Sequence, residues 1–139
     1  MSDLSAIRDG IKAVIAGRIA GLRVYPYPPA NPVPPCLIIE ADSPDGAVQT
    51  IDGNTYEINL EMTLRLHHGI PEEGWRELDE YKSPSGGKSI RAAIRTDPTL
   101  DGAAHAADVD WASLFDVDER QSQEYGCVFP IRVLFQQGA

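Results

Sequence analysis

The sequence predicts an α+β fold: a single domain spanning residues 1–139, with a mainly antiparallel sheet and a long central strand. An N-terminal helix and a helical pair are expected to pack on that sheet. Three patterns support this prediction: a helical repeat opens the chain, a strictly alternating stretch occupies its middle, and a second alternating stretch closes it. Because each such pattern leaves one apolar face, sheet and helices must bury those faces against each other.

The central strand is expected at Tyr56–His68. Its apolar face would carry Tyr56, Ile58, Leu60, Met62, Leu64 and Leu66, and its polar face Glu57, Asn59, Glu61, Thr63, Arg65 and His67. Successive strand side chains point to opposite sides, so one face should be buried and the other wet. At roughly 3.3 Å per residue the strand would be about 40 Å long, twice the usual length. We therefore expect it to extend beyond its own core toward a neighbouring chain.

The opening helix is expected to begin at Ser2 or Asp3 and to end near Gly21. Its apolar positions follow a three-and-four spacing: Leu4, Ile7, Ile11, Val14, Ile15, Ile19 and Leu22. Arg8 is one of its polar positions, and Gly10 and Gly17 should weaken it. A short strand is expected at Arg23–Tyr25.

Six prolines fall between Pro26 and Pro35, which excludes both a helix and an interior strand. The segment should be extended and stiff. It is expected to be a connector that is ordered by itself or by a partner and that contacts a neighbouring subunit or tail protein. The candidate interface residues are Pro28, Pro29, Pro32, Pro34, Arg65 and His67. The alternatives are a plain surface connector and a proline-rich ligand for an aromatic groove.

Further strands are expected at 36–41 and 47–51, with a hairpin turn at 52–54. Pro71 should begin a helix with Trp75, Leu78 and Tyr81 along one side, and a second helix should span 88–95. A strand over 108–118 would place Ser113 on the same face as Val109, Trp111, Phe115 and Val117. In the last strand, residues 125–135, Pro130 indicates an edge position or a bulge.

The composition excludes several classes of function. The formal net charge of −9 argues against recognition of nucleic acid, which requires a basic surface. No apolar run approaches the roughly 20 residues of a membrane span, and the acidic start does not fit a secretory signal, so a cytoplasmic protein is expected. Cys36 and Cys127 are then expected to be buried reduced thiols.

No pattern in the chain indicates catalysis, a cofactor or a metal site, so a non-enzymatic protein is expected. Gly86-Gly87-Lys88-Ser89 is similar to the end of a phosphate-binding loop, but Lys82 stands where that motif needs glycine. His67 and His68 should point to opposite faces of their strand and cannot bind one metal. Asp108, Asp110, Asp116 and Asp118 would line one strand face, most simply a solvated one, with side chains about 7 Å apart.

Three segments together resemble the tail-terminator (tail-completion) proteins of long-tailed bacteriophages. The first is the opening helix with Gly21–Tyr25 and the proline-rich segment, and the second is the long strand leading into a helix. The third runs from Leu78-Asp-Glu-Tyr81 through Ser83-Pro-Ser-Gly86 and Lys88–Ile94 to Asp97-Pro-Thr-Leu100. The resemblance covers nearly the whole chain, although its proline segment is unusually dense.

The resemblance implies a hexameric ring in the virion, assembled in the host cytoplasm, at the head-proximal end of the tail. Such a ring ends tail-tube growth and contacts the tail-tube protein and the head–tail connector, while genomic DNA passes through the lumen. Glu57, Glu61, Asp108, Asp110, Asp116 and Asp118 are the candidate acidic lumen; alternatively they keep the outer surface soluble. Other possibilities are a connector or tube subunit, or a small-ligand-binding or enzymatic domain that uses the aspartate face.

Overall fold

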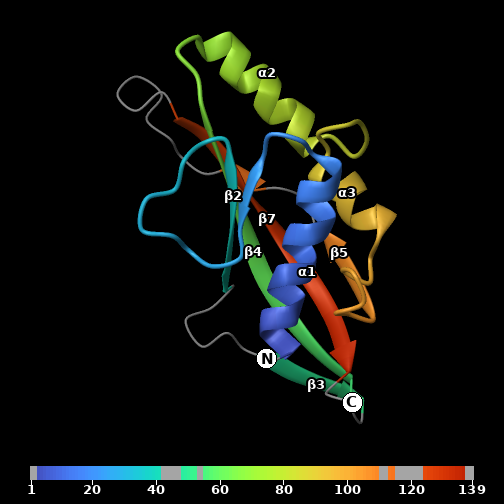
Figure 1. Cartoon of the computed structure of the whole chain (residues 1–139). Helices are drawn as coiled ribbons and strands as arrows, with labels where there is room; N and C mark the ends of the chain where they lie inside the picture. Colours follow the sequence, from blue (N-terminus) through green and yellow to red (C-terminus); the bar gives the residue numbers. More distant parts are fainter. Residues whose placement is uncertain (1–2, 42–47, 53–54, 110–112, 115–123, 137–139) are drawn as a thin grey trace.

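The computed structural model describes residues 3–41, 48–52, 55–109, 113–114 and 124–136. The helices are α1 (Asp3–Arg18), α2 (Pro71–Lys82) and α3 (Ile90–Thr96). The strands are β1 (Arg23–Tyr25), β2 (Cys36–Ala41), β3 (Val48–Asp52), β4 (Thr55–His67), β5 (Ala106–Val109), β6 (Ser113–Leu114) and β7 (Glu124–Gln136). Figure 1 shows the helices in front of a twisted sheet whose centre is the long antiparallel pair β4 and β7.

Within the described residues the strand order is β1-β2-β4-β7-β5, with β3 also paired to β4 and β6 to β7. Only the β1–β2 pair is parallel. The predicted α+β class, with its mainly antiparallel sheet and central long strand, is confirmed. β4 and β7 pair along their whole length, from Thr55 opposite Gln136 to His67 opposite Glu124.

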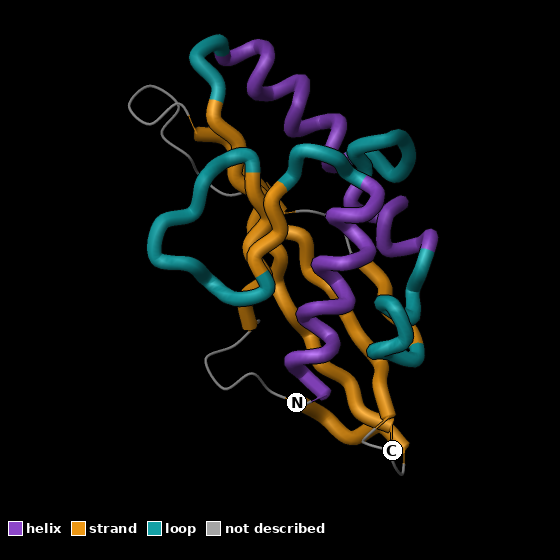
Figure 2. Tube along the Cα trace, viewed as in Figure 1, coloured by secondary structure: helices purple, strands orange, loops and turns teal. Residues whose placement is uncertain are grey.

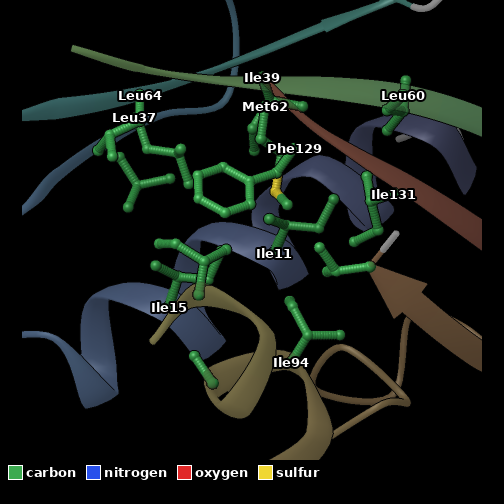
Figure 3. Packing of buried hydrophobic residues seen from close by; sticks show 14 of the residues in the cluster. Ile11, Ile15, Leu37, Ile39, Leu60, Met62, Leu64, Ile94, Phe129 and Ile131 are labelled. Carbon is green, nitrogen blue, oxygen red and sulfur yellow. The ribbon is translucent and has the colours of Figure 1, made fainter. Parts of the chain in front are cut away.

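The predicted apolar face of the central strand is confirmed. Ile58, Leu60, Met62, Leu64 and Leu66 are buried, and Tyr56 packs half-buried against the same core. Their register partners on β7 include Phe129 and Ile131, which are buried as well. Figure 3 shows Phe129 lying between the sheet and α1, with Ile11 and Ile15 of that helix on its far side.

All three helices contribute to this one core, so they cover a single face of the sheet. The buried helical residues are Ile7, Ile11, Ile15, Leu78, Tyr81, Ile90, Ala93 and Ile94. We call the opposite sheet face, which no described helix covers, the outer face. The core-facing side of α2 approaches β7 closely at Gly74, where an added Cβ would lie 2.5 Å from the Tyr125 ring.

Of the strand predicted at 108–118, the structure describes only the end of β5 and the two residues of β6, and the other positions lie outside the described residues. Val109 pairs with Ile131, and Ser113 pairs with Val128. The chain therefore advances four positions while its partners on β7 lie three apart. Because side chains alternate along β7, the position of Ser113 belongs to the outer face and that of Val109 to the helix-covered face, so the two do not share a face as expected.

Pro130 lies on β7 opposite Glu61, inside the sheet, so the predicted edge position is wrong. β4 pairs with β7 through Pro130 without a shift of register, so the alternative, a bulge, is not seen on that side of the strand. The change of register between β5 and β6 occurs across the part of β7 that contains Pro130. The residues that would face Pro130 on that side lie outside the described part of the chain.

The helical pair is confirmed, with α3 starting later than the predicted Lys88. Ser89 is the buried N-cap of α3: its Oγ accepts from the Ala92 N–H at 3.0 Å and donates to the Ser83 carbonyl at 2.5 Å. An N-cap residue such as Ser89 has non-helical backbone dihedral angles, so the helix itself begins at Ile90. This bond to Ser83 also holds the end of α2 against the start of α3.

Candidate interaction surfaces

The residues between β1 and β2, Pro26–Pro35, form a loop that swings away from the helices and the sheet (Figure 2). We call it the proline loop. β1 and β2 are parallel, so the chain must return along the sheet edge before β2 can begin. The loop is held at its base, where the Arg23 N–H donates to the Pro35 carbonyl at 3.3 Å.

Arg8 of α1 holds the other side of the proline loop. Its Nη1 donates to the carbonyl of Pro26 at 2.6 Å and to that of Ile39 at 2.8 Å. Its guanidinium also lies 4.6 Å from the centre of the Tyr27 ring. A planar cation that donates to two carbonyls and stacks on an aromatic ring keeps its neighbours in one geometry. Arg8 thus joins the helix, the loop and the sheet.

Further contacts within the loop region restrict its middle. The Val33 N–H donates to the Tyr25 hydroxyl at 3.3 Å, and Arg23 Nη1 lies 3.5 Å from the Val33 carbonyl. The predicted ordered connector is therefore ordered within the isolated chain.

The proline loop presents apolar side chains to solvent. Tyr27 is 52% exposed and Val33 is 49% exposed. Of the candidate interface prolines, Pro28 is exposed and Pro29, Pro32 and Pro34 are half-buried. The other large exposed hydrophobic residues of the described chain are Ile70 and Trp75, at the α2 end of the molecule. Two of these four therefore lie on one ten-residue loop.

The outer face brings together three of the candidate acidic residues. Glu57 and Glu61 are on β4, and Asp108 of β5 is opposite Arg132 of β7. Arg132 forms an ion pair with Glu57. Glu61 is opposite Glu40 of β2. The face is thus mixed in charge, with an arginine between two acids. Asp110, Asp116 and Asp118 lie outside the described residues.

Arg65 and His67 also lie on the outer face, near one end of β4. Arg65 is half-buried and pairs in register with Cys36, the first residue after the proline loop. His67 is exposed. The structure therefore places Arg65 beside the base of the loop, as a shared interface would require. His67 lies two residues farther along the strand, on the same face. His68, beyond the strand, pairs with Glu77 of α2.

A hollow of about 470 Å³, open to solvent, lies between α1 and the end of α3. We call it the α1–α3 hollow. It is lined by Ala13, Val14, Gly17 and Arg18 of α1 and by Thr96, Asp97 and Asp101. Asp97 accepts hydrogen bonds from the Thr99 hydroxyl at 2.5 Å and from the Asp101 N–H at 3.0 Å, and these bonds lower the pKa of its carboxyl group. Asp97 is therefore charged at neutral pH.

The segment that is similar to a phosphate-binding loop has another role. It follows α2, where the motif needs a strand, and its Ser89 hydroxyl is buried and bonded within the chain. The adjoining hollow of about 320 Å³ is lined partly by Asp79 and Glu80, which would repel phosphate. These contacts make the segment the junction between two helices.

Cysteines and metal ligands do not form a reactive centre within the described residues. Cys36 and Cys127 are both buried and reduced, as predicted. Burial raises the pKa of Cys127 to about 12, so its thiol stays protonated at neutral pH. The described part of the chain has no group of three or more His, Cys, Asp or Glu residues that could hold a metal ion. Nor does it have a helix long and apolar enough to cross a membrane.

The sequence patterns missed both Arg8 and the α1–α3 hollow. Arg8 reads as one of several polar helix positions, and its partners are 18 and 31 residues away. Two of the residues that line the hollow, Ala13 and Gly17, have small side chains, which by themselves indicate no surface. Comparison of the chain with protein-family models and with curated proteins found no match.

Proposed function

We propose that this chain is a structural subunit of a phage tail: it forms a ring on the head-proximal end of the tail tube, ends tube growth and joins the head connector. The observation that carries the proposal is the one-sided packing of the fold. Helices cover one face of two 13-residue strands, and within the described residues no helix covers the other face. Such a subunit has surface area for neighbours on a rigid frame.

Two further features support an assembly role. The three segments that resemble tail-terminator proteins fold into adjoining parts: α1 with the proline loop, the β4–α2 connection, and the α2–α3 junction. The proline loop is ordered before any partner binds, so docking loses little conformational entropy.

The experiment mixes the purified chain with a polymerising tail-tube protein and follows tube length by electron microscopy. We expect discrete rings of the chain alone, shorter tubes when it is added, and a ring at one end of each capped tube. If the chain were instead a head–tail connector, it would bind on the head side and leave tube length unchanged. If it were a tube subunit, it would itself polymerise. A chain that stays monomeric and leaves tube length unchanged would contradict the proposal.

A further inference from the structure

We infer that copies of this chain associate head to tail, with the proline loop of one copy inserted in the α1–α3 hollow of the next. This inference rests on the proposed function, because it names the contact that would build the ring. It is argued from the positions of the two surfaces, their shapes and their charges.

The two surfaces lie on opposite sides of α1. Arg8, which holds the loop, and Gly17, which lines the hollow, are nine residues apart. At 3.6 residues per turn this is about two and a half turns, so the two positions face opposite directions. Figure 1 shows the same arrangement, with the proline loop on the left of α1 and α3 on its right. A projection and a hollow on opposite sides cannot meet within one chain.

Opposed, unlike surfaces produce a heterologous contact. Each copy would use its loop on one neighbour and its hollow on the other, which closes into a ring when the rotation between copies permits. A twofold contact, by comparison, would bring the same surface together from both copies and stop at a dimer.

The shapes of the two surfaces agree with this contact. The loop presents Tyr27 and Val33, each about half exposed, on a backbone fixed by Arg8 and Tyr25. The hollow is open, and its α1 wall includes two small residues, Ala13 and Gly17, beside Val14 and Arg18. An added Cβ at Gly17 meets nothing within 4 Å, so space is available there for a partner's side chain.

The charges also agree. From Arg23 to Ile39 the sequence contains no acidic residue, although the chain as a whole has a net charge of −9. Arg8 and Arg23 lie at the base of the loop. The hollow has two carboxylates, Asp97 and Asp101, against one cation, Arg18. Copies with a large like charge repel each other, and a contact between a loop without acidic residues and an acidic hollow reduces that repulsion.

The test uses one variant for each surface. Val33→Glu places a charge on the loop and leaves the hollow intact, whereas Ala13→Trp fills the hollow and leaves the loop intact. Val33 and Ala13 are both exposed, so each variant should fold like the parent. Each variant alone should associate at least about tenfold more weakly. Val33→Glu would bury an unpaired charge in the contact, and Ala13→Trp would fill the space that the loop of the next copy needs.

Mixing the two variants is the decisive measurement. The loop of the Ala13→Trp chain can still enter the hollow of the Val33→Glu chain, so light scattering after size exclusion should show a 1:1 dimer that grows no further. Ile70→Glu and Glu73→Trp change exposed residues at the start of α2, away from both surfaces, and should form the same oligomer as the parent.

Two results would overturn the inference in distinguishable ways. If the parent forms rings but the mixed variants stay monomeric, or if either variant alone still forms rings, the contact is wrong and the ring proposal stands. If the parent is monomeric at every concentration and does not cap tubes, the proposed function fails as well.

Discussion

Gly10 and Gly74 occupy points where a helix approaches its neighbour more closely than a side chain would allow. Gly10 of α1 is buried, and an added Cβ would clash with the carbonyl oxygen of Leu100. Gly17, seven residues later, has open space around it. From the sequence both glycines only weaken the helix, but the structure separates a packing requirement at Gly10 from a position at Gly17 where a Cβ has open space within the chain.

Gly10→Ala and Gly17→Ala should therefore change stability in opposite directions. Gly10→Ala should destabilise the chain by about 1–3 kcal/mol, because the helix must move away from Leu100. Gly17→Ala should stabilise it by up to about 1 kcal/mol, because alanine loses less backbone entropy in a helix. Urea unfolding of both variants measures the difference. Equal effects would show that α1 does not approach Leu100 as described.

The buried thiol of Cys127 should make stability depend on pH in the alkaline range. Its pKa rises from 9 in the unfolded chain to about 12 in the folded one, because burial disfavours the thiolate. Between these values only the unfolded state releases the proton, so stability is fully present below pH 9 and falls above it. The slope is about 1.4 kcal/mol per pH unit. Urea unfolding at pH 8 and pH 10.5 should show this loss in the parent and a smaller one in Cys127→Ala. An equal loss in both would assign the effect to other groups.

Among the elements, β4 shows how much the sequence can predict. Strict alternation determined its two faces, because a strand has only two sides and one must be buried. The same reasoning failed for Ser113, because it lies four positions after Val109 while their partners on β7 lie three apart. An alternating pattern contains no information about such a change of register. The contacts of Arg8 could not be predicted from the sequence either, because only folding brings the proline loop next to α1.

The face assignment of β4 can be tested with neighbouring residues. Leu64→Asp should place an unpaired carboxylate among fully buried side chains and destabilise the chain by several kcal/mol. Thr63→Asp, one position away on the outer face, should cost far less because water can reach it. Thermal melting of both variants is the measurement, and similar melting temperatures would contradict the assignment.

The stiffness of the proline loop should matter more for assembly than for folding. Replacing Pro28, Pro29 and Pro32 with glycine leaves the Arg8 and Tyr25 contacts to the backbone in place. The loop then has more conformations to lose when it docks. We expect weaker oligomer formation in sedimentation experiments and nearly unchanged urea unfolding of the monomer. A parallel loss of both would assign the prolines to folding alone.

At the scale of the whole molecule, the acidic residues of the outer face do not form a uniform negative surface. Glu57 forms an ion pair with Arg132, and Asp108 is opposite the same arginine. Glu40 and Glu61 are opposite each other on β2 and β4. If the outer face lines a lumen, its negative charge therefore comes mainly from Glu61 in the middle of β4, from Glu40 beside it, and from Asp108 on β5. Whether it lines the lumen or the exterior decides whether these charges meet DNA.

The last prediction uses that difference. Duplex DNA carries about one negative charge per 1.7 Å, and at physiological salt charges interact over about 8 Å. A negative lumen repels the duplex weakly and lets it slide, whereas lysines would hold its phosphates. Glu61→Lys combined with Asp108→Lys should therefore leave tails correctly terminated but slow DNA delivery. Glu73→Lys with Asp79→Lys, on exposed positions of α2, is the matched control and should deliver DNA normally. Normal delivery by particles with the first pair, and with intact rings in electron micrographs, would place the outer face away from the DNA.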